Sequence, residues 1–178
     1  MKVITAPEEY HPRPDDVTCF LAGGITNCYE WQKEVIKTLQ GYDKNGIEVD
    51  HLVIFNPRRE VFDISNPRPT EEQIEWEFYA LEQCDIFSMY FCESEKSVLP
   101  ICLYELGRNL VRMQQRHPMS WRDRLVISVE DGYSRKNDVF IQTKLAVDKD
   151  LVSIGSNVTP QSHAKNIMMA YTWLNEDL

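Results

Sequence analysis

Two glutamates are the side chains best placed to act on a substrate, Glu105 in "PICLYELG" and Glu77 in "QIEWE". Glu105 falls in the expected first turn of a helix, where the helix dipole favours an ionised carboxylate. Such a carboxylate can attack a sugar carbon and expel a base through an oxocarbenium-like transition state, while a second carboxyl group protonates or orients the base. Position alone favours a simpler interpretation, an ordinary helix-start acid with Arg108 as its partner three residues later.

Glu77 borders a predicted buried surface. A helix is expected over residues 71–83, and its buried face is predicted to contain Ile74, Phe78 and Leu81. Glu77 lies at helical spacing from two of these residues, at the rim of the face. An acid there loses solvation, which raises its pKa and prepares it to donate or share a proton. An arginine partner, or contact with solvent, explains the position equally well.

Glycines and arginines near expected strand ends could belong to a binding site. The turn "AGGITN" places Gly23 and Gly24 where a ligand can approach the backbone and a helix N-terminus favours anions. Simple turn packing is the commoner reason for such a pair. Arg58 and Arg59 follow a strand end and could bind a phosphate or carboxylate, or they could be surface cations. Gly107 lies inside an expected helix at a cost of ~1 kcal/mol relative to alanine, which predicts a close approach to its backbone.

Five short apolar runs alternate with helical patterns, and these elements must position the candidate side chains. Strands are expected at residues 17–22, 51–55, 85–91, 124–129 and 151–155. Helices are expected at residues 29–40, 71–83, 102–115, 137–147 and 160–174. Asn27 is the expected cap of the first helix. The second follows a proline-rich loop (56–70), and Thr70 and Gln73 have the spacing of a capping box at its start.

This order predicts the fold class. Alternating strands and helices are typical of an α/β protein, here a Rossmann/flavodoxin-like three-layer sandwich with a five-stranded, mainly parallel sheet. At 178 residues the chain is expected to form a single domain over residues 1–178. The site of such a fold lies beyond the carboxyl ends of its strands.

Composition restricts the class of partner and the compartment. A net charge of -9 argues against a surface that coats nucleic acid. Five cysteines without CxxC spacing predict free, mostly buried thiols in a reducing compartment, and four scattered histidines predict no metal site. No apolar segment has the length of a signal peptide core or a membrane span. We therefore expect a cytoplasmic protein that does not enter a membrane.

Five short motifs occur together in a recognisable order: "FLAGGIT…WQ", "FNPRR", "QIEWE…AL…CDIF", "PICLYELG" and "RKNDV". Together they resemble the nucleoside 2-deoxyribosyltransferase-like proteins, relatives of the 2′-deoxynucleoside 5′-phosphate N-glycosidases. The resemblance covers roughly residues 17–140. It implies cleavage or exchange of the N-glycosidic bond of a 2′-deoxynucleoside by double displacement, without a cofactor or metal.

The resemblance also implies residue roles. Glu105 of "YELG" matches the nucleophile that forms a covalent deoxyribosyl ester. Glu77 matches an aspartate that contacts the leaving base in better-known members. Asp85 of "CDIF" matches an acid whose role is structural or catalytic. Gly23 and Gly24 match the loop that faces the sugar or phosphate.

A further match concerns assembly. Asn137 of "RKNDV" matches a polar motif near the site that could be contributed to a neighbouring subunit. The family's sites tend to be completed across subunits, so the resemblance implies a homo-oligomer. Its implied partners are a small-molecule nucleoside or nucleotide and a free base.

Two departures from the family pattern leave alternatives open. Better-known members carry a tyrosine at the end of the first strand whose hydroxyl helps set the nucleophile, and here that position is Phe20. The phosphohydrolase branch has a serine- and glycine-rich run before its "YELG", whereas this chain has "KSVLPICL". An N-glycoside hydrolase acting on a nucleotide or NAD-like substrate, a non-catalytic nucleoside- or nucleotide-binding module and an inactive scaffold remain alternatives. The preferred base and acceptor are open.

Overall fold

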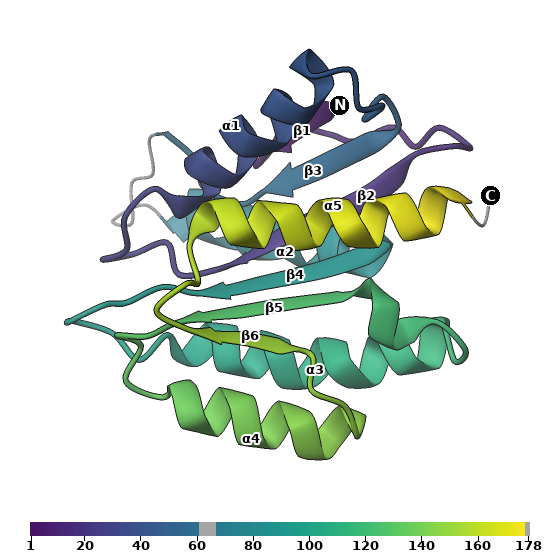
Figure 1. Cartoon of the computed structure of the whole chain (residues 1–178). Helices are drawn as coiled ribbons and strands as arrows, with labels where there is room; N and C mark the ends of the chain where they lie inside the picture. Colours follow the sequence, from purple (N-terminus) through teal and green to yellow (C-terminus); the bar gives the residue numbers. More distant parts are fainter. Residues whose placement is uncertain (61–66, 177–178) are drawn as a thin grey trace.

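The computed structural model describes residues 1–60 and 67–176, and these form three layers around one parallel sheet (Figure 1). Within the described residues the sheet has six strands in the order β1-β3-β2-β4-β5-β6. The strands are β1 (Lys2–Thr5), β2 (Val17–Gly23), β3 (Leu52–Asn56), β4 (Ile86–Phe91), β5 (Leu125–Glu130) and β6 (Val152–Gly155). The central strands are buried on both faces, which explains why they read as continuous apolar runs.

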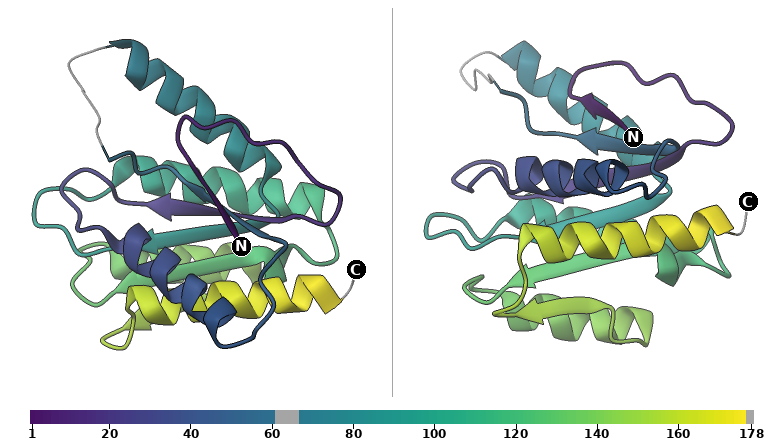
Figure 2. Two further views of the ribbon diagram at one scale, coloured as in Figure 1. Left: turned by 90° about the horizontal axis from the view of Figure 1, so that it is seen from above. Right: turned by 45° about the horizontal axis from the view of Figure 1, so that its top comes forward.

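Helices cover both faces of the sheet (Figure 2). One face carries α1 (Trp31–Lys44) and α5 (Pro160–Glu176), which pack against each other. The other carries α2 (Pro67–Gln83), α3 (Pro100–Arg116) and α4 (Lys136–Val147), and a short 3-10 helix, η1 (Trp121–Arg124), precedes β5. None of the helices in the described part of the chain is long and apolar enough to cross a membrane.

The strand order identifies the place where a site can form. Without β1 it is the flavodoxin-like order, in which the chain moves from β2 to β3 on one side and then crosses to β4 on the other. The connections before and after β3 therefore run over opposite faces and open a crevice at the carboxyl ends of β2 and β4. The α/β class, the parallel sheet and the three layers are confirmed.

The prediction of five strands was wrong by one. The additional strand, β1, pairs with β3 at the edge of the sheet. It has four residues and only one of them is fully buried, so it carries little apolar signal. No helix separates it from β2, which is why a search for strand–helix alternation passed over it.

Two helix starts also differ from expectation. The first helix begins at Trp31, with Glu30 and not Asn27 at its cap, and Asn27 instead adopts a left-handed turn with φ 60°. The second begins at Pro67, so the last part of the predicted loop over 56–70 is helical and Thr70 is not its cap. Proline is tolerated in a first turn because the N–H it lacks has no partner there. Residues 61–66 of the predicted loop lie outside the described residues.

Candidate active site

Two adjoining cavities lie at the carboxyl edge of the sheet. The smaller cavity, of about 210 Å³, is bounded by the end of β2, the loop after it and the first turns of α3, and its lining includes Phe20, Gly23, Gly24, Ser97 and Cys102. The larger cavity, of about 570 Å³, runs between α2 and α3 and is lined mainly by apolar side chains, including Ile74, Phe78, Ile101 and Tyr104.

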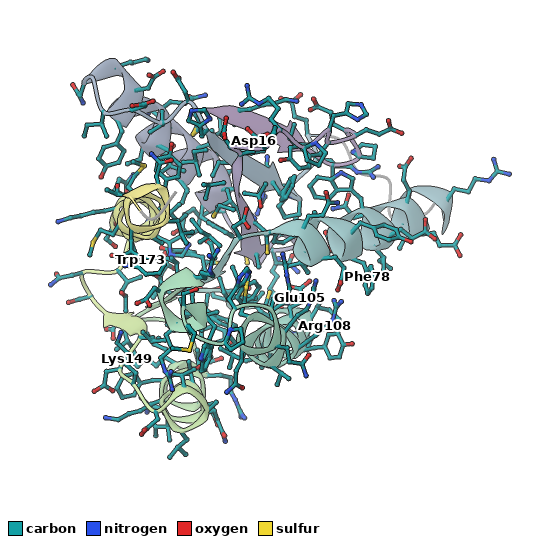
Figure 3. The ribbon with its side chains drawn as sticks, turned by 90° about the vertical axis from the view of Figure 1, so that its right-hand side faces the viewer. Asp16, Phe78, Glu105, Arg108, Lys149 and Trp173 are labelled. Atoms are coloured by element: carbon teal, nitrogen blue, oxygen red, sulfur yellow. The ribbon has the colours of Figure 1, made fainter. Side chains whose placement is uncertain are left out.

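Glu77 and Glu105 line both cavities. One comes from α2 and the other from α3, so the cavities meet where the two helices approach each other. Figure 3 shows Glu105 on α3 close to this junction. The two glutamates singled out in the sequence are thus brought to one place by elements that are separate in the chain.

The environment of Glu105 makes its carboxyl group a weak acid. Burial and, next, the negative charge of Glu77 raise the pKa of Glu105 from 4.5 to about 7, and the charge of Arg108 offsets only part of this. Arg108 is not the ion-pair partner expected from the sequence, because its guanidinium lies 2.8 Å from the Glu82 carboxylate. Glu105 also lies in the second turn of α3, which begins at Pro100, and not in the first turn that the dipole argument assumed.

Glu77 is held by a neighbouring amide. Burial raises its pKa, while a hydrogen bond from Gln73 and the charge of Arg59 oppose the shift. The Nε2 of Gln73 donates to the Pro57 carbonyl oxygen at 2.7 Å and to Oε1 of Glu77 at 2.6 Å. A carbonyl oxygen can only accept, so Pro57 fixes the orientation of the amide. Oε1 of Glu77 therefore receives a hydrogen, and a proton bound by this carboxyl group is carried by Oε2.

The apolar stripe of α2 faces the larger cavity and not the core. Ile74 is 61% exposed and Phe78 45%, whereas Leu81 is buried, so the predicted buried face was wrong for the first two. The reason is that the N-terminal half of α2 projects away from the sheet (Figure 2). Figure 3 shows Phe78 on the side of α2 nearest Arg108, whose guanidinium carbon lies 4.6 Å from the ring centroid.

Arg58 holds the loop between β2 and α1. Its Nη2 donates to the carbonyl oxygens of Gly24 (3.3 Å), Ile25 (3.0 Å), Cys28 (3.3 Å) and Tyr29 (3.1 Å), and its Nε donates to Gln32 at 2.8 Å. Arg58 lines neither cavity. Its guanidinium thus acts on the chain itself, in place of the ligand expected from the sequence.

Packing accounts for both glycines of the β2 turn. Gly23 has φ 151°, and a Cβ there would lie 2.4 Å from the Tyr90 carbonyl oxygen. A Cβ on Gly24 would lie 2.4 Å from the sulfur of Cys28. Both glycines also line the smaller cavity, so close packing and close approach by a ligand apply to the same turn.

The remaining candidates lie elsewhere or in other contacts. Asp85 precedes β4 at the amino edge of the sheet, where its Oδ2 accepts hydrogen bonds from the Thr18 amide (2.9 Å) and hydroxyl (2.7 Å). Asn137 is exposed in the first turn of α4 and lines neither cavity. Phe20 is buried at the smaller cavity, 6.3 Å from the Trp76 ring centroid. Gly107 has open space where its Cβ would be, so the predicted close approach was wrong.

The hydrogen bond from Gln73 to Glu77 was not predicted from the sequence. Gln73 was considered only as a capping residue, although its spacing of four from Glu77 puts both on one side of a helix. In residues 1–60 and 67–176, no group of three His, Cys, Asp or Glu side chains is arranged to hold a metal ion.

Comparison with known proteins identifies the family of the chain. A family model described as "Nucleoside 2-deoxyribosyltransferase like" matches residues 16–117, more than half of the chain. The matched segment begins just before β2, contains both glutamates and ends after α3. A search of curated proteins found no match. On the strength of the family match, the chain belongs to the nucleoside 2-deoxyribosyltransferase-like family.

Proposed function

We propose that this protein cleaves or exchanges the N-glycosidic bond of a 2′-deoxynucleoside by double displacement, with Glu105 as the nucleophile and Glu77 serving the leaving base. The observation that carries the proposal is the pair itself. Carboxyl groups from two helices line the same two cavities, and the charge of Glu77 helps raise the pKa of Glu105 to about 7. Membership of the family supports the substrate class.

The two cavities differ in a way that fits the two halves of a nucleoside. The smaller cavity, beside the Gly23–Gly24 turn and the start of α3, has the size and the backbone access for a sugar. The larger cavity is mainly apolar and carries the rings of Phe78 and Tyr104, which suits a planar base. The glycosidic bond would then lie at their junction, beside both glutamates.

The proton shared by the pair gives each carboxyl group a role. Burial and mutual repulsion raise the pKa of both carboxyl groups and favour a pair that holds one proton at and just below neutral pH, with one group charged and the other neutral. As positive charge develops on the sugar, it favours ionised Glu105, and Glu77 protonates the leaving base through Oε2. Glu105 then bonds to C1′ and the base departs. An acceptor base or water displaces Glu105 in the second step, and Glu77 takes up the proton that this acceptor releases.

A second candidate keeps the site and changes the substrate. Arg59 and Arg108 line the larger cavity, which favours an anionic substrate such as a nucleotide or an NAD-like molecule, cleaved by water. Their guanidinium groups already form ion pairs, Arg59 with Glu72 at 3.0 Å and Arg108 with Glu82 at 2.8 Å. This neutralisation makes the nucleoside the first candidate.

We also propose that the protein is a homo-oligomer in which a second copy covers the mouth of the larger cavity. Four apolar side chains there are exposed by 45 to 68%: Ile74, Phe78, Ile101 and Tyr104. Such a cluster beside a site is typical of an interface. Light scattering on the native protein and on Tyr104→Glu should give a larger mass for the native chain than for the variant. A monomeric native protein would contradict this assembly.

The decisive experiment is base exchange. The protein is incubated with each deoxynucleoside and a different free base, and products are followed by liquid chromatography and mass spectrometry. Glu105→Ala tests the nucleophile, and Glu75→Ala is the matched control because Glu75 is exposed on α2 and lines neither cavity.

Each outcome identifies one function. A new deoxynucleoside that is lost in Glu105→Ala and kept in Glu75→Ala supports transfer through Glu105. Free base and deoxyribose, whatever base is offered, indicate the hydrolase, and the assay is then repeated with nucleotides and NAD. Tight binding without turnover indicates a binding module, which the absence of a tyrosine hydroxyl at Phe20 favours. Neither binding nor turnover would overturn the proposal.

A further inference from the structure

Two cysteines from different parts of the chain meet beside the smaller cavity. Cys28 lies half-buried in the loop after β2, and Cys92 lies fully buried directly after β4. Both sulfurs face Gly24, where a Cβ would lie 2.4 Å from the sulfur of Cys28 and 3.1 Å from that of Cys92. Neither is in a disulfide. The meeting of these two thiols has no part in the proposed reaction.

The surroundings give the two thiols unequal reactivity. A hydrogen bond from Cys92 lowers the pKa of Cys28, and the charge of Arg58 and a hydrogen bond from Ser94 act in the same direction against burial. The pKa of Cys92 is raised well above its ordinary value by its bond to Cys28 and by burial. The more accessible sulfur is thus the one with thiolate character, and the buried one is a thiol in contact with it. This is the arrangement of an attacking and a resolving cysteine.

A third thiol nearby does not share this relationship. Cys102 lines the smaller cavity, but burial and the charge of Glu105 raise its pKa, and it makes no side-chain hydrogen bond with Cys28. The pair that can be oxidised is therefore Cys28 with Cys92.

We propose that Cys28 and Cys92 form a peroxide-sensitive dithiol that cross-links the loop after β2 to the end of β4. The Cys28 thiolate attacks one oxygen of hydrogen peroxide, the S–O bond forms as the O–O bond breaks, and hydroxide leaves and takes a proton to become water. The Cys92 thiol then loses its proton, its sulfur bonds to the Cys28 sulfur, and the hydroxyl departs as a second water. Two thiols are oxidised by two electrons and one peroxide is reduced.

The cross-link would act on the site through Gly24. A disulfide holds its sulfurs about 2.05 Å apart, closer than two hydrogen-bonded thiols, so the loop that carries Cys28 must move toward β4. Gly24 touches both sulfurs and lines the smaller cavity, so its backbone moves with them. The predicted loss of activity rests on the proposed function, whereas formation of the disulfide does not.

Peptide mapping tests the disulfide directly. The protein is treated with a small excess of hydrogen peroxide, free thiols are blocked with N-ethylmaleimide, and the chain is cleaved with chymotrypsin and trypsin without reduction. Phe20 separates Cys19 from Cys28, Phe87 separates Cys84 from Cys92, and the tryptic site at Lys96 separates Cys92 from Cys102, so each thiol can be assigned. We expect loss of two of the five thiols and a peptide joining Cys28 to Cys92.

Variants assign the order of events. Cys92→Ser should leave Cys28 as a sulfenic acid that dimedone traps, and Cys28→Ser should leave Cys92 unreacted at the same peroxide dose. Cys84→Ser is the control, because Cys84 is buried at the other edge of the sheet, and it should form the cross-link normally. If Cys92→Ser does not fold, protection of Cys92 in Cys28→Ser carries the same information.

Some results would overturn the inference. They are first oxidation at any other cysteine, over-oxidation of Cys28 without the Cys92 link, or cross-linking that survives in Cys28→Ser. Turnover is measured in parallel and should fall on oxidation and return with dithiothreitol in the native protein but not change in Cys28→Ser. A disulfide without any turnover in the reduced protein would count against the proposed reaction and leave the dithiol standing. A disulfide that forms without altering measurable turnover would refute the effect on the site.

Discussion

The charge of Glu77 on α2 acts on Glu105 of α3 across the cavities that both residues line, and it is the second cause, after burial, of a pKa of about 7 for Glu105. The positive charge of Arg108 lowers the pKa of Glu105 only in part, because Arg108 forms an ion pair with Glu82 at 2.8 Å. The result is a carboxyl group that changes its charge near neutral pH, which an isolated glutamate does not do.

Removing the charge of Glu77 should lower the pKa of Glu105. The proposed reaction needs Glu105 ionised and a proton on Glu77, so kcat/KM of the native protein should fall as pH rises through about 7, where the pair loses this proton. In Glu77→Gln one of the two causes that raise this pKa is gone and residue 77 has no proton to lose, so kcat/KM should be lower overall but should no longer fall near pH 7. The measurement is a pH–rate profile with deoxynucleoside. Glu75→Gln is the control and should keep the falling limb, whereas a fall near pH 7 that persists in Glu77→Gln would refute the coupling.

Replacing Glu105 should separate activity from stability. Glu105→Gln should reduce turnover on the order of 10³-fold or more, because the nucleophile is lost. The folded-state pKa of about 7 exceeds the ordinary 4.5, so the folded chain binds more protons between these values and the free energy of unfolding falls as pH rises through that window. Above pH 7 the ionised side chain costs the fold up to about 3 kcal/mol, which the variant should regain. Urea unfolding at pH 5 and pH 8 measures this.

Glu82→Gln is the counterpart that excludes a general effect of removing charge. Glu82 lies 2.8 Å from Arg108 and 2.6 Å from Arg112, so its ionised form is paired. Its replacement should lower stability by about 1 kcal/mol, since the pairs are partly exposed. Equal stabilisation of Glu82→Gln and Glu105→Gln at pH 8 would contradict the account of Glu105.

Arg58→Lys should loosen the loop after β2 without touching the substrate. Lysine cannot reproduce a planar fork that serves four carbonyl oxygens and Gln32, so these mostly half-buried acceptors lose their donor. We expect a loss of about 2 kcal/mol in unfolding free energy and a raised KM, because Gly24 lines the smaller cavity. Arg135→Lys is the matched control, because Arg135 is the exposed N-cap residue of α4 and pairs with Asp138 there. A stable variant with unchanged KM would show that the loop is held by other contacts.

Phe20→Tyr tests the departure from the family pattern. Phe20 and Glu105 both line the smaller cavity, whose space of about 210 Å³ can take an added hydroxyl. A hydroxyl that donates to ionised Glu105 should lower its pKa and move the falling limb of the pH–rate profile to lower pH. A limb that stays in place, in a variant as stable as the native chain, would show that Phe20 is not beside the nucleophile.

Much of the fold follows from patterns that depend on burial. The central strands read as apolar runs because helices cover both faces, and their alternation with helices gives the parallel order. The edge strand β1 has four residues and is partly exposed, so it lacks that signal. Periodicity also showed that α2 has an apolar stripe, but not that the stripe containing Ile74 and Phe78 faces α3 across a cavity.

The site residues, too, could be predicted only where a sequence pattern carries the signal. Family motifs placed Glu77 and Glu105 together, and the structure sets them in the same cavities. Arg58 could not be assigned from sequence because its partners are backbone carbonyls, which every residue type carries. Asp85 precedes β4, and this position already indicates the amino edge of a parallel sheet, away from the cavities.

His163 should give the fold an acid sensitivity opposite in sign to that of Glu105. Its ring lies between the hydroxyls of Ser88 and Ser128, each 2.7 Å from a ring nitrogen, and burial lowers its pKa from 6.5 to about 3. The unfolded chain therefore binds more protons than the folded chain between these values, and the contribution of His163 to stability, complete above pH 6.5, is lost as pH falls. His163→Gln should be less stable than the native protein at pH 7, and this gap should narrow toward pH 4.5 in urea unfolding. The exposed His11→Gln should show no such change, and a constant gap would mean that His163 stabilises the fold by packing alone.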